Sequence, residues 1–259
     1  TVRKGYEEVM SDPGAGAKKG QDELGADAIC LQLRSIDPNG SDASPESAAE
    51  TVKKVAEAIN IPLIVYGTGT PDKDAEVLKK VGEAMPDANI PIGPVEESNH
   101  RLIGAAAMGY KKPVVGFTSM DVNLAKQLNV LLTQLGVPED KIIIDPTTGA
   151  LGYGLEYCYS IMERDRLAAL MQNDGKMQMP ILSNLAPETW KAKESRVSEE
   201  VEPTYGNVET RGILWEAITA TTLLLAGTDI LVMRHPDAVK LVRAAIEGLQ
   251  TQSKEKVAS

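Results

Sequence analysis

The sequence has few of the side chains that most often bind metals or form covalent intermediates. Its 259 residues include two cysteines, two histidines and a single phenylalanine. Cys30 and Cys158 belong to no CxxC motif and to no Cys/His cluster. The chain therefore offers no zinc-ligand spacing, and it has too few thiolates to hold an iron–sulfur cluster alone. We interpret both as reduced, buried thiols, which fits a cytoplasmic compartment.

Long apolar runs and clustered positive charge are also absent. No stretch approaches the ~18 continuous apolar residues of a membrane span, and no signal-peptide pattern is present. The formal net charge is −10. This charge argues against nucleic acid and against an anionic membrane surface as partners, because both are bound by clustered lysine and arginine.

Several familiar catalytic motifs are missing as well. The sequence contains no GxSxG nucleophile elbow, no HExxH pair and no Ser–His–Asp arrangement. Lysines near the predicted strand ends are lacking, so Schiff-base chemistry has no obvious nucleophile. No GxGxxG motif opens the first strand–helix unit. We therefore assign no catalytic residue and no metal-binding residue.

The sequence does contain a regular alternation of short apolar strands and helices. Strands rich in Ile, Leu and Val, as parallel strands covered on both faces are, are predicted at residues 28–33, 61–66, 89–93, 113–118, 141–144, 180–183 and 229–233. Helices are predicted at residues 14–24, 44–58, 71–84, up to 108, up to 135, 155–172, 209–225 and 236–249. The charged, irregular segment 190–207 is interpreted as either a lid or a partner contact.

The seven strand–helix units, preceded by one helix, are one strand short of a (β/α)8 barrel. We predict a single TIM-barrel domain over residues 1–250, with its first strand upstream of residue 1, followed by a polar tail at residues 251–259. The competing interpretation is an open, doubly wound sheet, whose reversal of strand order cannot be read from a sequence.

Polar residues gather at the carboxyl ends of the predicted strands, which in a TIM barrel meet at one mouth and build the active site. Structural roles compete with functional ones at several of these positions. Asp121 and Asp72 have the residue type and place of helix N-caps, and the Asp145 carboxylate is placed to accept backbone N–H bonds from its own loop. His235 precedes a proline, as an ordinary loop histidine does. The strand-end candidates are Gly67, Thr68, Gly69, Glu96, Glu97, Asn99, Ser119, Asp121, Asn123, Asp145, Thr147, Thr148, Ser183, Asn184, Arg234 and His235.

The most distinctive strand end is residues 145–154, DPTTGALGYG. A buried strand delivers a carboxylate and two hydroxyls to this loop, and Pro146 ends the strand because proline has no N–H for the ladder. The loop lacks the Lys-Ser/Thr ending of a P-loop, so phosphate binding is poorly supported. A mouth rich in hydroxyl, amide and carboxylate groups but poor in nucleophiles favours the binding of a large polar ligand or partner over covalent chemistry.

Residues 144–164 resemble the signature of the small (delta) subunit of the corrinoid iron–sulfur protein, which belongs to the carbon monoxide dehydrogenase/acetyl-CoA synthase complex. The stretches 190–194, 211–217 and 233–236 match the same family. The resemblance extends from about residue 11 to residue 249, and its motifs are long and specific.

This resemblance implies a TIM barrel in a heterodimer with a larger subunit. In the family, the larger subunit carries the [4Fe–4S] cluster and a corrinoid-binding domain, and the small subunit's barrel mouth covers the cobamide. The corrinoid cobalt accepts a methyl group from a methyl-pterin through a methyltransferase and passes it to acetyl-CoA synthase. The family chain also continues upstream and includes a further strand, in agreement with the predicted barrel.

Our leading hypothesis is therefore a methyl-carrier subunit whose mouth lies over the corrin. A second hypothesis is a pterin-dependent methyltransferase that binds methyl-pterin in its own mouth, and a third is a purely structural partner. The residues expected to face the cofactor are Asp145, Thr147, Thr148, Gly149, Gly152, Gly154, Asp121, Asn123, Glu97, Asn99 and Gly67.

Overall fold

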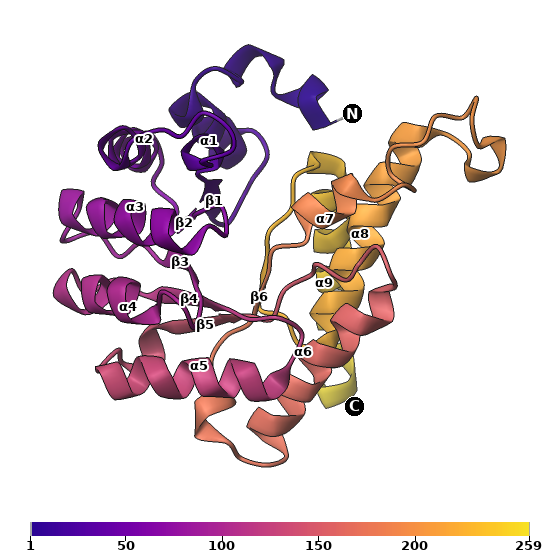
Figure 1. The fold of residues 1–259 in the computed structure, drawn as a ribbon. Helices are drawn as coiled ribbons and strands as arrows, with labels where there is room; N and C mark the ends of the chain where they lie inside the picture. The colour runs from indigo at the N-terminus through magenta and orange to yellow at the C-terminus, as the bar shows by residue number, and fades with distance from the viewer. Residues whose placement is uncertain (1, 259) are drawn as a thin grey trace.

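The computed structural model describes the secondary structure of residues 2–258 and the side chains of residues 2–251 (Figure 1). The expected tail at 251–259 therefore falls almost wholly outside the described side chains. The main elements are α1 (Pro13–Asp22), β1 (Ile29–Gln32), α2 (Pro45–Ala58), β2 (Leu63–Tyr66), α3 (Pro71–Ala84), β3 (Ile92–Val95), α4 (His100–Gly109), β4 (Val114–Phe117), α5 (Val122–Leu135), β5 (Ile142–Asp145), α6 (Leu155–Leu170), β6 (Leu182–Ser183), α7 (Ala186–Lys191), α8 (Val208–Ala226), β7 (Ile230–Leu231) and α9 (Pro236–Ala258).

The strands are parallel neighbours in the order in which they occur along the chain. One sheet has the order β1-β2-β3-β4-β5, and β6 pairs with β7. A parallel bridge between Ile144 and Ile181 joins β5 to the start of β6. Because a doubly wound sheet reverses its strand order, that competing interpretation is wrong, and the predicted alternation of parallel strands and helices is confirmed.

Two layers of side chains pack against the strands, as the two-residue period of a strand requires. The larger core lies between strands and helices and includes Val65, Ile92 and Ile144. The inner layer is formed by the alternate strand residues Ile64, Tyr66, Val115, Ile143 and Leu182, with Cys30, Ile230 and Val232 against them. A layer of apolar side chains on the inner side of the strands is the packing expected inside a barrel.

Local capping residues set several helix ends where the sequence indicated them. The Asp12 carboxylate accepts bonds from the backbone N–H groups of Gly14, at 2.9 Å, and Ala15, at 3.1 Å, at the start of α1. Asp121 does the same for α5. Gly136 ends α5 with a φ of 108°, a left-handed conformation that glycine adopts without a Cβ clash. Asp121 is therefore an N-cap, worth about 1 kcal/mol of stability.

The segment 190–207 is more ordered than the sequence indicated. It begins with the end of the short helix α7, which was not predicted, and contains a 3-10 turn at Pro203–Tyr205. Arg211 holds the segment in place: its Nη1 donates to the Gly206 carbonyl at 3.0 Å, and its other nitrogens donate to the carbonyls of Glu194 and Val197. The guanidinium also lies over the Tyr205 ring. In Figure 1 this orange connection projects beyond the N-terminal end of α8.

The first and last strands face a common cavity of about 560 Å³, which we call the seam. It is lined by β1 and β7 and by residues of α1 and α9, mostly apolar, such as Ala17, Leu31, Val232 and Val242. No ladder between β1 and β7 is recorded within residues 2–258. One end of the seam is bridged by the ion pair of Arg243 with Asp27 at 2.7 Å. No helix of the described chain is long and apolar enough to span a bilayer.

Candidate functional site

The carboxyl ends of the strands meet in a polar cluster of Gln32, Tyr66, Asp145, Asn184 and Arg234, which we call the mouth cluster. The Tyr66 hydroxyl donates to Asp145 Oδ2 at 2.5 Å. The Gln32 amide donates to Asn184 Oδ1 at 2.8 Å and accepts from Arg234 Nη2 at 3.2 Å. These bonds join β1, β2, β5 and the segments after β6 and β7, so the ends of distant strands form a single surface.

Asp145 lies at the floor of the mouth and is 1% exposed. Burial raises its pKa to about 6, although the hydrogen bonds from Tyr66 and from the Thr147 backbone N–H oppose the rise. Burial and the adjacent Asp145 carboxylate together raise the pKa of Tyr66 well above its usual value. Both carboxylate oxygens of Asp145 already accept bonds, from Tyr66 and from Thr147 at 3.0 Å. Asp145 is therefore a positioning group that lies beneath the surface, because its side chain is almost wholly buried.

The loop after Asp145 is held in a strained conformation. Thr147 has a φ of 64°, a region that β-branched residues rarely adopt and that typically costs about 1–3 kcal/mol. The Thr147 hydroxyl accepts from the Gly149 N–H at 3.1 Å, and the Thr148 hydroxyl donates to the Asn184 carbonyl at 2.9 Å. Gly149 and Gly152 are exposed, and a Cβ on Gly152 would meet nothing within 4 Å. The loop therefore presents exposed backbone around the buried carboxylate.

The structure gives local structural roles to three other residues expected to face the cofactor. Asp121 is the N-cap of α5, and Asn99 is 2% exposed, with its Oδ1 accepting the Glu96 N–H at 2.7 Å. Gly67 lies against buried Asp74, whose Oδ1 would be 2.3 Å from a Cβ at position 67. The Asp74 carboxylate in turn accepts the N–H groups of residues 68–70. These groups shape the rim by fixing its backbone.

Glu97 and Asn123 are exposed on the rim. Glu97 accepts a long bond, 3.4 Å, from Gln127 of α5. It lines a side pocket of about 260 Å³ together with Phe117, Ser119 and residues of α5. Burial raises the pKa of Glu96 in the same pocket, with a further rise from nearby Asp74. This side pocket lies beside the mouth cluster and adds carboxylate and hydroxyl groups to the rim.

Behind β7, Glu216 of α8 holds the turn that carries Arg234. Its buried carboxylate accepts the backbone N–H of Arg234 at 2.7 Å and that of His235 at 2.9 Å. His235 is nearly buried and stacks on Trp190, with ring centroids 5.9 Å apart, and burial lowers its pKa. His235 therefore packs as part of the turn, consistent with the loop interpretation. Among residues 2–251, no group of three or more His, Cys, Asp or Glu side chains is arranged to hold a metal ion.

The sequence pattern indicated no site role for Gln32 and Tyr66, which were predicted only as strand residues. Each is the last residue of its strand. A polar residue that ends an apolar strand was the available signal, because such a position faces the mouth in a barrel. Asn184 and Arg234 were recognised as strand-end residues but were not among those expected to face the cofactor. The structure places both in the mouth cluster.

The fold and the mouth cluster together define an α/β protein with consecutive parallel strands of TIM-barrel type and a polar surface at the strand ends. A solved structure of Yersinia pestis DHPS with a pterine-sulfa conjugate has the same fold. The TM-score is 0.62 at 14% identity, and the match covers 93% of this chain and 90% of that chain. At this identity the likeness concerns the fold alone.

The chain belongs to the family of CO dehydrogenase/acetyl-CoA synthase delta subunits, whose sequence profile matches residues 1–247. The acetyl-CoA decarbonylase/synthase complex subunit delta of Methanosarcina mazei is 38% identical over 253 residues, covering 96% of this chain and 58% of the relative. The subunit of the same name from Methanopyrus kandleri is 38% identical over 247 residues, covering 95% and 60%. The family resemblance is thus confirmed, and the chain spans about three fifths of the length of these relatives.

Proposed function

We propose that this chain is the small-subunit barrel of a corrinoid iron–sulfur methyl carrier and that its mouth covers the cobamide. The observation that carries the proposal is the polar surface that the strand ends build together. Buried inner-layer side chains such as Val115, Ile143 and Leu182 lie beneath it, and the buried Tyr66–Asp145 pair joins β2 to β5. A flat ligand such as a corrin macrocycle would lie across these strand ends.

The residues of the rim fit such a ligand. Gly149 and Gly152 expose backbone where side chains would hold a flat ring away, and neither is needed for core packing. Gln32, Asn184 and Arg234 offer amide and guanidinium groups that match the amide side chains of a cobamide. When bound, the cobamide would supply the cobalt that carries the methyl group. This chain's own residues would position the ring and exclude water, because the mouth holds no nucleophile.

The proposal includes the assembly in which such a chain works. The larger subunit would hold the [4Fe–4S] cluster and most of the corrinoid site, since this chain has only two cysteines, Cys30 and Cys158. A methyl-pterin methyltransferase would deliver the methyl group, and acetyl-CoA synthase would receive it. Both cysteines are free thiols, which supports a reducing cytoplasmic site.

To test whether the mouth covers the cobamide, the full-length protein is reconstituted with its larger subunit and cobamide. Gly152→Trp places a bulky side chain on the rim at a position with nothing within 4 Å of a Cβ, so the fold should tolerate it. We expect loss of cobamide retention and of methyl transfer, while Gly175→Trp, at a glycine with equally open surroundings away from the mouth, leaves both unchanged. Unchanged cobamide absorbance and unchanged transfer in the Gly152 variant would contradict the proposal.

The same experiment separates the second hypothesis, an enzyme that binds methyl-pterin in its own mouth. Asp145 is 1% exposed beneath its loop, which disfavours this residue as a pterin acceptor. Titration of the full-length small subunit with methyl-pterin, without its partner, should show no saturable binding. Saturable binding that is abolished by Asp145→Asn would favour the enzyme over the carrier.

We also propose that the barrel is closed by an eighth strand, contributed by a segment preceding residue 1 and lying in the seam. The backbone N–H groups of Ile29 and Leu33 bond to the β2 side, and those of Ile230 and Val232 bond to the β6 side. By alternation, the N–H groups of Cys30 and Leu231 face the seam. The apolar lining of the seam suits an extended apolar segment between these edges. A strand in this position would precede α1, as the strand–helix alternation requires.

Hydrogen exchange tests the closure. In the full-length protein we expect the amides of Cys30 and Leu231 to be protected at least ~100-fold relative to the chain of residues 1–259, because each would then donate to the added strand. Ile29 and Ile230, already bonded to neighbouring strands, serve as internal controls. Equal exchange of the two seam-facing amides in both proteins would refute the closure.

A further inference from the structure

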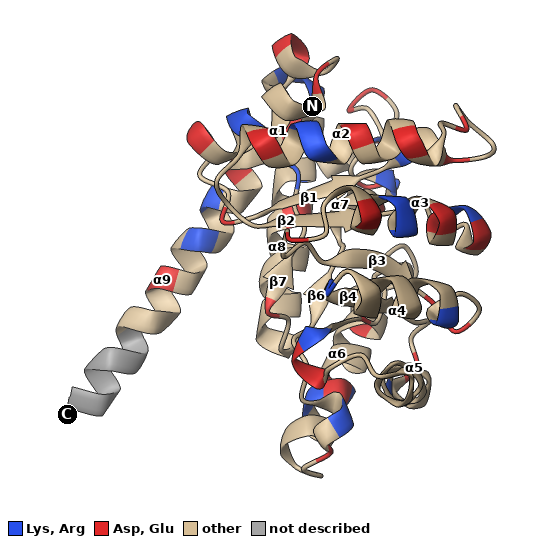
Figure 2. Ribbon diagram, turned by 90° about the vertical axis from the view of Figure 1, so that its left-hand side faces the viewer, with Lys and Arg blue, Asp and Glu red and all other residues tan. Residues whose placement is uncertain are grey.

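Helix α8 has a composition that its surroundings in this chain do not explain. Between Arg211 and Asp229 its only charged residue is Glu216, and that side chain is buried. An α-helix that is apolar all round is normally covered on all sides. Helices α2 and α3, by contrast, have charged outer faces, with ion pairs such as Lys53–Glu57 and Lys80–Glu83. Figure 2 shows this difference: α1, α2 and α3 carry red and blue bands, whereas α8 is almost wholly tan.

The outer face of α8 forms an exposed apolar line, which we call the α8 ridge. It consists of Leu214, Ile218 and Leu225, which are 44%, 57% and 63% exposed. Their spacing of four and seven residues places them on one side of the helix. The helices packed on either side of α8 add exposed leucines, Leu170 on α6 and Leu241 on α9. Exposed apolar side chains thus occur on three adjacent helices.

The size of this surface matches what a stable interface requires. From their exposed fractions, the five side chains present on the order of 500 Å² of apolar area, near the upper end of the largest apolar patches on monomers. A standard interface buries roughly 800 Å² per partner, of which somewhat more than half is apolar. The ridge and its two flanking leucines would therefore supply about the whole apolar share of one side of such an interface.

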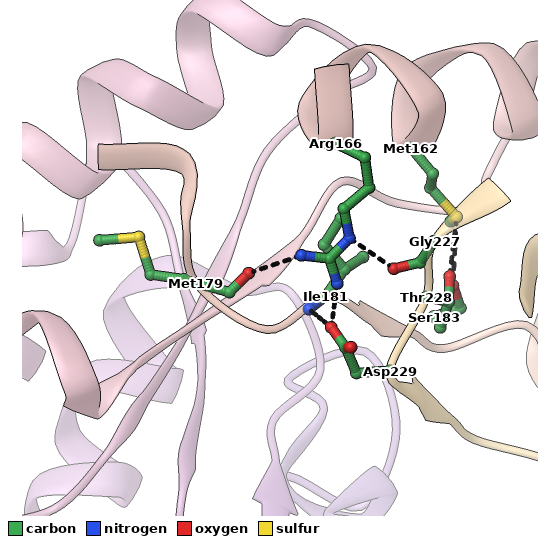
Figure 3. A network of polar contacts seen from close by, with 8 residues as sticks. All are labelled: Met162, Arg166, Met179, Ile181, Ser183, Gly227, Thr228 and Asp229. Atoms are coloured by element: carbon green, nitrogen blue, oxygen red, sulfur yellow. Dashed lines mark hydrogen bonds and ion pairs between the residues drawn. The ribbon is translucent and has the colours of Figure 1, made fainter. Parts of the chain in front are cut away.

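The helix is also held rigidly at both ends, so docking would cost little conformational entropy. At its C-terminal end, Arg166 Nε donates to the Gly227 carbonyl at 2.7 Å, and the same guanidinium pairs with Asp229, whose carboxylate accepts the Ile181 N–H at 2.7 Å (Figure 3). Nearer its N-terminal end, Gly212 lies against the Trp190 ring, and Glu216 binds the turn after β7. The ridge is thus a preformed surface.

We propose that the α8 ridge is the surface on which the larger subunit docks an α-helix. The inference rests on the proposed function for the existence of that subunit. A helix is the partner element that fits, because side chains at four- and seven-residue spacing form a ridge that packs into the groove of a facing helix. The partner's helix would present small and apolar side chains, since a charge opposite this uncharged surface would be buried without a counter-ion. The family relatives are by name subunits of a complex, which supports a second subunit over a solvent-exposed role.

The test co-expresses the full-length protein with its larger subunit and measures the dissociation constant by analytical ultracentrifugation. Ile218→Glu and Leu225→Glu should each weaken the heterodimer roughly 30-fold or more, the loss expected when a central interface residue is disrupted. Leu102→Glu on α4 is the matched control, because Leu102 is 64% exposed and Leu225 is 63% exposed. We expect the control to bind as the wild type does. Thermal melting of all three variants should remain close to that of the wild type, which separates lost docking from lost folding.

A cross-linking measurement identifies the occupant directly. A photo-cross-linker attached at Ile218→Cys should yield a covalent product with the mass of the heterodimer, and one attached at Leu102→Cys should not. A product with the mass of two copies of this chain, or a cross-link within one chain, would overturn the proposal. Ridge variants that bind as tightly as the wild type, or a control variant that dissociates equally, would also overturn it.

The two proposals fail in different ways. If the wild type forms the coloured, cobamide-containing heterodimer and the ridge variants do so equally well, the docking site is wrong and the carrier function remains. If the wild type forms no complex with the larger subunit at all, the proposed function is wrong and the ridge proposal fails with it.

Discussion

Asp165, on the inner face of α6, provides the sharpest test of the electrostatics of this fold. Its side chain is fully buried, and neither carboxylate oxygen has a hydrogen-bond partner. Burial raises its pKa to about 7, and the attraction of Arg166 only partly opposes this. The ordinary value of 3.8 applies once the chain unfolds. The folded protein therefore holds a proton at Asp165 over a pH range in which the unfolded chain has released it.

The sign of the effect on stability follows from this difference. Between about pH 4 and pH 7 the folded state binds more protons than the unfolded state, so the free energy of unfolding falls as the pH rises. A shift of roughly three units corresponds to a loss of about 4 kcal/mol across this window, with no further change at higher pH. Asp145, whose pKa is raised to about 6, also lowers the free energy of unfolding as the pH rises, and its effect is complete by about pH 6.

Asp165→Asn removes the titration while keeping the shape of the side chain. We expect the variant to gain stability relative to the wild type as the pH rises from 5 to 8, by roughly 2–4 kcal/mol. Urea denaturation at pH 5, 6, 7 and 8 measures the difference, with Asp87→Asn, an exposed carboxylate, as control. A stability difference between variant and wild type that is constant across this range would refute the assignment of a protonated Asp165.

Three further predictions concern single contacts. Tyr66→Phe removes the hydrogen bond that lowers the pKa of Asp145, so that pKa should rise above about 6 in a carboxyl NMR titration, with a stability loss of about 1–3 kcal/mol. Gly67→Ala should destabilise by about 2–4 kcal/mol in denaturant unfolding, because its Cβ would lie 2.3 Å from Asp74 Oδ1, whereas Gly152→Ala, with nothing within 4 Å, should be near neutral. Arg211→Ala should expose residues 194–206 to limited proteolysis without changing global unfolding, because its guanidinium bonds to three carbonyls of that segment.

The buried polar groups of the mouth mainly bind the backbone of its own loops. Asp145 accepts bonds from the Tyr66 hydroxyl and the Thr147 backbone, and Asp74 accepts three backbone N–H groups, so both carboxylates help to fix loops. The exposed groups of the rim include the Arg234 guanidinium, the Asn123 amide, the Glu97 carboxylate and the backbone of Gly149 and Gly152. Such groups are suited to hold and orient a ligand, as the proposed cofactor cover requires.

The order of the elements could be read from the sequence because it depends on local patterns. Short apolar runs predicted the strands, helical spacing predicted the main helices, and Asp12, Asp121 and Gly136 marked helix ends through contacts within a few residues. Helix α7 escaped prediction because six residues carry too little periodicity to be recognised. The family was readable for a similar reason, since its signature is a continuous stretch of chain.

The composition of the mouth was decided only by the tertiary structure. Tyr66 meets Asp145 and Gln32 meets Asn184 although 79 and 152 residues separate the partners. A strand's two-residue period tells which side chains share a face, but the register between strands determines which of them touch. The same limit applies to Asn99 and Gly67, whose polar or flexible character suggested ligand binding, while burial against their neighbours assigned them to the scaffold. The sequence by itself determined a barrel-like series of parallel strands with polar ends, and the packing of those ends decided which groups remain free to meet a ligand.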